Sequence, residues 1–177
     1  MAATMTLISS QVLGASTATV TFSSIPQTYN DLKLVASVRG DYSGGANFFY
    51  IAFNSAGAFG SQQRLTVDGN PVVATAYTSA NSTNLMFSSD YVASGANIFG
   101  SSEIYLANYT SSGNKQFFGF GAAENNTNPV TTGVAFGLGA GALLWTSTAI
   151  TSIAFSCPAA TNFIANSAFY LYGIKNS

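Results

Sequence analysis

Polar and apolar residues alternate most clearly between Ser101 and Ala122, and this pattern predicts a β-hairpin. Residues 103–108 alternate with a period near two, and Lys115 to Ala122 resumes the alternation with Phe118 and Phe120 on one face. That period is typical of strands. Residues 109–114 between the two runs are rich in Ser, Gly and Asn, which favour turns, so the chain is expected to reverse there.

Further strands are predicted along the rest of the chain, and no convincing helix is. The run from Asp31 to Arg39 alternates most regularly, with its leucines on an inner face and the charged residues Asp31, Lys33 and Arg39 on an outer face. Phe48–Asn54 and the closing run Ala168–Ile174 are apolar on both faces, so each is expected to be covered on both faces. The other predicted strands are Thr6–Leu13, Thr17–Ser23, Val130–Leu138 and Ile150–Phe155.

The pattern loosens from Ser55 to Asn97, where turns separate short candidate strands near Arg64–Val67, Val72–Tyr77 and Asn84–Ser88. A long excursion of this kind is where binding surface is expected. The glycine-rich residues 137–141 predict a bend or a close sheet contact. About eight to ten antiparallel strands with uneven turn spacing indicate an all-β, two-sheet sandwich in one domain over residues 1–177, with jelly-roll topology favoured.

Composition agrees with an all-β chain and limits its partners. The 177 residues are 47% hydrophobic and 14% aromatic but only 6% charged, with a net charge of −1. No basic run is present to bind a nucleic-acid backbone, and low net charge with much apolar surface favours self-association. No signal peptide is expected at the N-terminus, and the longest apolar run, Val134–Trp145, is too short to span a membrane as a helix.

Little in the sequence points to catalysis, so no enzyme activity, cofactor or metal is expected. The chain has no histidine, which removes the commonest general base and the usual zinc ligand. A pair of carboxylates could still hydrolyse a glycoside, but the six acids are scattered, and Asp90 and Glu103 are candidates only because a tyrosine lies nearby. The single cysteine, Cys157, is expected in the core. The six acids are Asp31, Asp41, Asp68, Asp90, Glu103 and Glu124.

A sugar site is the binding function that this composition accommodates. Sugar rings stack on aromatic planes, and amide side chains hold their hydroxyl groups. Trp145, Tyr77 and Tyr91 lie near predicted loops and are the candidate glycan-binding residues. The nearby amides are Asn81, Asn84 and Asn97.

Several short strings resemble those of small β-rich virion proteins of tailed bacteriophages. The strings are Ser24-Ile25-Pro26 followed by Tyr29, Asp31 and Leu32; the run from Tyr105 to Thr110; Ile150-Thr151-Ser152-Ile153; and the ending Phe169 to Ile174. They mark strands and turns rather than a catalytic motif. The resemblance implies a sandwich used either as a capsid decoration or cement subunit, or as part of a tail fibre.

The first hypothesis is therefore a capsid-exterior decoration or cement protein, assembled in the bacterial cytoplasm into the virion. Its expected partners are the major capsid protein and itself, as a homotrimer. The alternative is a tail-fibre or tail-tip domain that binds host surface glycans. The two strands that are apolar on both faces supply the candidate intersubunit residues, which are Phe48, Tyr50, Phe169, Tyr170, Leu171 and Tyr172.

Overall fold

The computed structural model describes residues 4–41, 47–54, 59–67, 73–79, 85–91, 97–123, 135–145, 148–157 and 161–175. For strands β5, β6, β7 and β10 it describes the backbone only. These residues contain twelve strands and no helix, hence no helix that could cross a membrane. The strands are β1 (Thr4–Val12), β2 (Thr19–Phe22), β3 (Asp31–Gly40), β4 (Asn47–Phe53), β5 (Phe59–Val67), β6 (Val73–Ser79), β7 (Leu85–Tyr91), β8 (Gly100–Leu106), β9 (Lys115–Ala123), β10 (Ala135–Trp145), β11 (Ile153–Ser156) and β12 (Ala168–Lys175).

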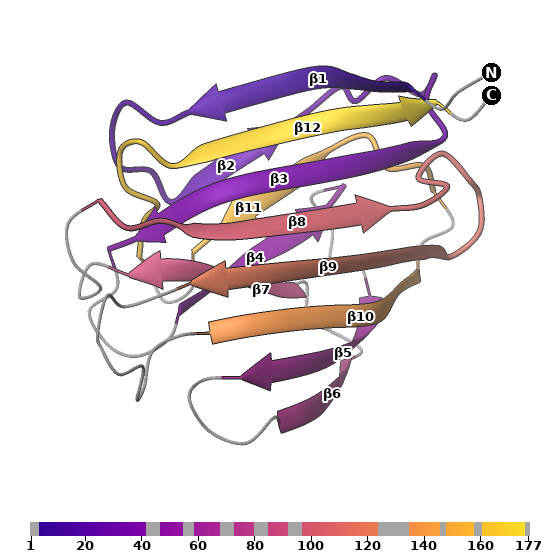
Figure 1. Cartoon of the computed structure of the whole chain (residues 1–177). Coiled ribbons are helices and arrows are strands. Elements are labelled where there is room, and N and C mark those ends of the chain that lie inside the picture. The colour runs from indigo at the N-terminus through magenta and orange to yellow at the C-terminus, as the bar shows by residue number, and fades with distance from the viewer. Residues whose placement is uncertain are drawn as a thin grey trace.

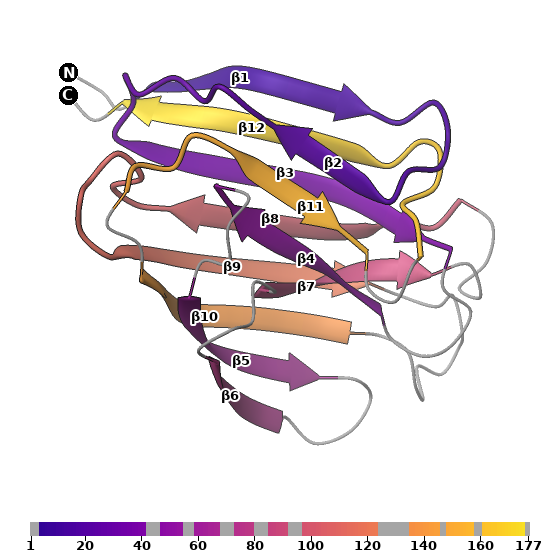
Figure 2. The ribbon, with the colours of Figure 1, turned by 180° about the vertical axis from the view of Figure 1, so that it is seen from behind.

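The strands form two layers, so the all-β sandwich expected from the sequence is confirmed. The first sheet has the order β1-β12-β3-β8-β9 and continues through β10, β5 and β6 (Figure 1). The second sheet has the order β2-β11-β4-β7 and covers one face of the first (Figure 2). All pairings are antiparallel except a short parallel contact of β3 with β7, at Arg39–Asp90 and Gly40–Tyr91.

The pairings are nested around the middle of the chain. Strands β1 and β12 pair in the first sheet while β2 and β11 pair in the second, and likewise β3 pairs with β8 while β4 pairs with β7. The hairpins β5–β6 and β9–β10 are additions that extend the first sheet beyond β8. The twelve strands of the described residues exceed the eight to ten expected, and β5, β6 and β7 lie where three short candidate strands were expected between residues 55 and 97.

Alternating inward side chains make the core between the sheets. In β9 every second residue from Lys115 to Ala123 is buried, and the inward residues of β3 and β12 are buried too. Phe169 of the first sheet packs on Phe155 of the second and on Phe163, each with ring centroids 5.0 Å apart. Phe49 of β4 extends the cluster, 6.1 Å from Phe155. Aromatic contacts of this kind add to the hydrophobic burial that joins the two layers.

The predicted reversal between β8 and β9 is confirmed, although one of its residues is not a surface residue. Asn108 has φ 50°, a value that Asn tolerates in turns. Tyr109 is fully buried and its hydroxyl donates to the carbonyl oxygen of Pro26. Lys115 is also buried and donates from Nζ to the carbonyl oxygens of Ser111 (2.7 Å) and Gly113 (2.9 Å). This turn is therefore tied to the core at both ends.

The glycine-rich residues 137–141 lie within β10, which pairs with β5 on one side and with β9 on the other. The strand contains a bulge at these residues. The register shifts between Leu138 and Ala142 against β5, and between Gly139 and Ala142 against β9. Extra residues at a bulge bend a strand and increase its twist. The glycines thus permit an irregular strand rather than a loop.

Candidate functional site

The exposed apolar side chains gather on one side of the sandwich, the face of the first sheet that points away from the second. We call this side the outer face. Opposed residues on neighbouring strands share a face, and the pairings give a row across five strands: Leu7, Tyr172, Lys33, Tyr105 and Phe118. The next row is Ser10, Tyr170, Val35, Glu103 and Phe120.

Five large hydrophobic side chains are exposed among those that the structure describes, and all five lie on the outer face. Phe118 and Phe120 of β9 are 52% and 41% exposed. Met5, Leu7 and Val12 of β1 are 56%, 50% and 61% exposed. They form two groups on the same face, one on β1 and one on β9, separated by β12, β3 and β8. Monomeric proteins usually scatter such residues singly, so each group indicates a surface used for contact.

Tyr105, Phe118 and Phe120 form an aromatic platform at the β8–β9 side of this face. The rings of Tyr105 and Phe118 stack with centroids 5.4 Å apart and planes 24° apart. Phe120 lies opposite Glu103 on the neighbouring strand. Stacking restricts the motion of exposed rings, and rings that are already ordered lose less entropy when a partner covers them.

Asp31 holds the far end of the platform in place. Its carboxylate accepts a hydrogen bond from the hydroxyl of Tyr105 at 2.5 Å and another from the backbone N–H of Asn108 at 2.8 Å. Burial, and then the hydrogen bond to Asp31, raises the pKa of Tyr105 to about 12. The phenol therefore remains a hydrogen-bond donor at neutral pH, and its ring is fixed by stacking on one side and by the carboxylate at its tip.

The alternation placed Asp31 on the correct side of β3, since it pairs with Ile174 in the same outward row as Met5. Its exposure was not as expected: Asp31 and Arg39 are buried, whereas Lys33 is half-buried on the outer face. Asp31 is covered because Tyr105 and Asn108, from the neighbouring strand and turn, donate hydrogen bonds to its carboxylate. Hydrogen-bond donors of this kind offset the free-energy cost of burying a carboxylate.

A small pocket of about 90 Å³ adjoins the platform. Lys33 and Glu103 form an ion pair at its side, with Nζ 2.7 Å from the carboxylate. The pair is charge-neutral and adds a donor and an acceptor to an otherwise apolar site. The pocket is lined by Lys33, Glu103, Ile104, Tyr105, Phe118 and Phe120.

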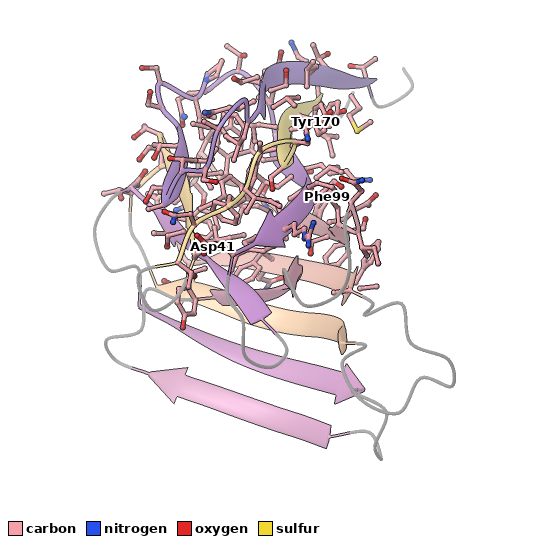
Figure 3. All side chains as sticks on the ribbon, turned by 90° about the vertical axis from the view of Figure 1, so that its left-hand side faces the viewer. Asp41, Phe99 and Tyr170 are labelled. Carbon is pink, nitrogen blue, oxygen red and sulfur yellow. The ribbon has the colours of Figure 1, made fainter. Side chains whose placement is uncertain are left out.

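The candidate intersubunit residues are divided between the core and the surface. Phe169 and Leu171 are fully buried between the sheets, where no partner reaches them. Tyr170, labelled in Figure 3, and Tyr172 are half-buried on the outer face. Tyr50 is half-buried on β4 of the second sheet, and the side chain of Phe48 lies outside the described residues.

The candidate glycan-binding residues lie on three different strands. Trp145 ends β10, Tyr77 is in β6 and Tyr91 ends β7. Strands β10 and β6 both neighbour β5 in the first sheet, whereas β7 belongs to the second sheet. Their side chains lie outside the described residues, as do Asn81 and Asn84, so glycan binding through this set stays a prediction.

The acids whose side chains are described have structural partners. Asp31 bonds to Tyr105 and Asn108 as above, and Glu103 pairs with Lys33. Asp41, labelled in Figure 3, accepts hydrogen bonds from the backbone N–H and from Nδ2 of Asn162, both at 2.7 Å. The backbone of Asp90 lies beside Arg39, while Asp68 and Glu124 are outside the described residues. Within the described part of the chain no three acidic or sulfur-bearing residues gather as metal ligands.

Cys157 packs against the core and is half-buried, close to the expected position. Burial raises the pKa of its thiol to about 12, with a hydrogen bond to Thr161 opposing and the charge of Asp41 adding to the shift. A thiol becomes a nucleophile by losing its proton. Cys157 is therefore an unreactive packing residue at neutral pH.

The platform was partly visible in the sequence, since the alternation already placed Phe118 and Phe120 on one face. The sequence did not show that this face of β9 is the exposed one. The opposite face carries the smaller residues Gly119 and Gly121, and yet it is the face that is buried.

The comparisons add no relative: no protein-family model matches the chain, and no curated protein is significantly similar to it in sequence.

Proposed function

We propose that the protein is a non-enzymatic structural subunit of a tailed-bacteriophage virion, which docks on the exterior of the head through the outer face of its first sheet. The observation that carries the proposal is that all five exposed large hydrophobic side chains, among those described, lie on that face. The proposed partner is the major capsid protein, and the platform of Tyr105, Phe118 and Phe120 is the proposed centre of the contact.

The physical basis of docking is burial of this apolar surface. A standard interface covers about 800 Å² on each partner, and apolar area contributes roughly 25 cal/mol per Å² before the costs of association. Rigid aromatic side chains at the centre of an interface are the usual hot spots. The single ion pair beside the platform, Lys33 with Glu103, leaves the site neutral and limits the desolvation cost.

The nested pairing of the strands supports a jelly-roll framework, which stays a prediction. In that topology the chain folds as one long hairpin that is rolled into two four-stranded sheets. Here β1-β12-β3-β8 would form one sheet and β2-β11-β4-β7 the other, with the β5–β6 and β9–β10 hairpins inserted. Jelly rolls occur in viral capsid and lectin domains, so the framework is compatible with the proposed role by fold analogy.

The test is co-sedimentation of the purified protein with phage heads produced without it. Substitution of both exposed phenylalanines, Phe118→Ser with Phe120→Ser, is expected to reduce binding at least about tenfold, since each is an exposed anchor. Thr19→Ser with Thr21→Ser, at exposed positions of β2 in the second sheet, is the control outside the docking face and is expected to bind like the wild type. Equal binding by the double variant and the wild type would refute docking through the platform.

Immunogold labelling of intact virions tests the location independently. Labels over the head are expected. Labels confined to the tail would refute decoration, and absence of the protein from dissociated virions would refute the virion assignment altogether.

The pocket favours a second candidate function, the binding of a glycan. The rings of Tyr105 and Phe118 offer a flat apolar surface for a sugar ring, and Lys33 and Glu103 offer a donor and an acceptor for its hydroxyl groups. A glycan array distinguishes the sites: loss of signal on Phe118→Ala would favour the pocket, and loss on Trp145→Ala would favour the set expected from the sequence. No signal with wild-type protein would count against glycan binding.

A further inference from the structure

Strand β1 is an unusual edge for a sheet. In the described part of the chain it pairs with β12 alone, so its other side is open, and Figure 1 shows it as the outermost strand. Its nine residues contain no charge and no proline. Soluble proteins usually protect an open edge with lysine, with proline or by keeping it short, because its free N–H and C=O groups accept another strand.

The strand also exposes apolar side chains beside that open edge. Met5, Leu7 and Val12 are each at least half exposed. They lie on the outer face opposite Ile174, Tyr172 and Ala168 of β12. A second strand placed against the open edge would cover them from the other side.

A bulge determines how a second strand can fit. The register shifts between Leu7 and Ser9, so Ile8 is the extra residue and its side chain packs against the core. Met5 and Leu7 point outward before the bulge, whereas Ser10 and Val12 point outward after it. This outward set is symmetric about the point between Ile8 and Ser9.

We propose that two copies of this chain associate through antiparallel pairing of β1 with β1, about a two-fold axis between Ile8 and Ser9. In this register Met5 lies opposite Val12 of the second copy, and Leu7 lies opposite Ser10 of the second copy. A shift by one residue in either direction over the whole strand would place outward residues opposite inward ones. The bulge therefore specifies one full-length register.

A second copy suits this edge because the pairing is self-complementary. Two-fold symmetry brings the same strand to both sides, so a lone charge in it would lie opposite an uncharged residue of the second copy, and β1 carries no charge. The product is a dimer with one continuous sheet, in which the two outer faces adjoin. This differs from the homotrimer expected from the sequence, and it does not depend on the proposed docking to a capsid.

Sedimentation of the purified full chain over a concentration series tests the proposal. The wild type is expected to approach twice the chain mass of 18.3 kDa. The double substitution Leu7→Lys with Ser10→Lys places like charges opposite each other twice per dimer, and is expected to weaken dimerisation at least about tenfold. Leu7→Lys with Ser10→Glu differs at one position only and places opposite charges there, so it is expected to recover at least about fivefold of that loss.

The matched control is Gln116→Lys with Ala122→Lys, which adds the same charge to exposed positions of β9, and it is expected to dimerise like the wild type. Thermal unfolding of each variant verifies that it is folded. A monomeric wild type at every concentration overturns the proposal. So does an oligomer that the two lysines leave intact, a trimer included. The proposed register is overturned if the two double variants, Leu7→Lys with Ser10→Lys and Leu7→Lys with Ser10→Glu, weaken dimerisation equally.

Discussion

Gly173 of β12 lies directly beneath the ring of Tyr29, and replacing it with alanine tests how tightly this part of the core is packed. A methyl group at Gly173 would lie 2.4 Å from Cγ, 2.5 Å from Cδ2 and 2.6 Å from Cδ1 of that ring. Carbon atoms in contact are normally about 3.5–4.0 Å apart. The ring would have to move by about 1 Å or more.

The surroundings of Tyr29 resist that movement. Its side chain packs against the hydrophobic core, and the next residue, Asn30, donates its backbone N–H to the carbonyl oxygen of Ile174 at 2.9 Å. Overpacking of this kind costs about 1–3 kcal/mol. Alanine recovers about 0.5–1 kcal/mol, because it loses less backbone entropy on folding than glycine. We therefore expect Gly173→Ala to lower the free energy of unfolding by about 0.5–2 kcal/mol.

Urea unfolding at fixed protein concentration measures this loss as a lower midpoint with an unchanged slope. The thermal midpoint should fall by about 2–4 °C for each kcal/mol in a chain of this size. Gly113→Ala is the matched control, because an added methyl group there meets no atom within 4 Å. It is expected to leave stability unchanged or to raise it slightly.

A double-mutant cycle with Tyr29→Ala identifies the cause. If the ring is what the new methyl group meets, Gly173→Ala should cost much less in the Tyr29→Ala background. The reasoning is refuted if Gly173→Ala is as stable as the wild type, or if its cost is the same with and without the tyrosine ring.

The remaining predictions concern titratable side chains. Folding raises the pKa of Tyr105 from 10.0 to about 12, so its contribution to stability is present below pH 10 and lost as the pH rises to 12; Tyr105→Phe should flatten the fall in urea midpoint across that window. Lys115→Met removes two hydrogen bonds to turn carbonyls and should cost about 1–3 kcal/mol in urea unfolding; no loss would show that the turn does not need the ammonium. Cys157 should react with a disulfide reagent at pH 8 far more slowly in folded than in urea-unfolded protein, and equal rates would contradict its burial.

Part of the candidate site was predictable from neighbouring residues. The alternation in β9 put Phe118 and Phe120 together, and the same pattern in β8 put Glu103 with Tyr105. What could not be predicted was that these residues meet on a solvent-facing side, because burial depends on which face the second sheet covers. Hydrophobicity alone would have turned the phenylalanines inward.

The role of Asp31 was equally beyond prediction from local sequence. Its partners are Tyr105, 74 positions away in sequence, and Asn108, 77 positions away. A hydrogen bond between such distant residues exists only after β3 and β8 have paired. The same holds for the outer face as a whole, since its rows combine residues from both ends of the chain.

The sequence by itself determined that the chain forms strands and placed several of them closely, although the predicted Val130–Leu138 overlaps the observed β10 only in part. The predicted Asp31–Arg39 and Ala168–Ile174 differ from the observed β3 and β12 by one residue each, because period-two alternation is a local property of the chain. Only the tertiary structure decided which strands pair, which face is wet, and where the bulge in β1 changes the outward set. Those features arise from contacts such as Thr4 with Lys175, which join opposite ends of the chain and leave no signal in the residues around either one.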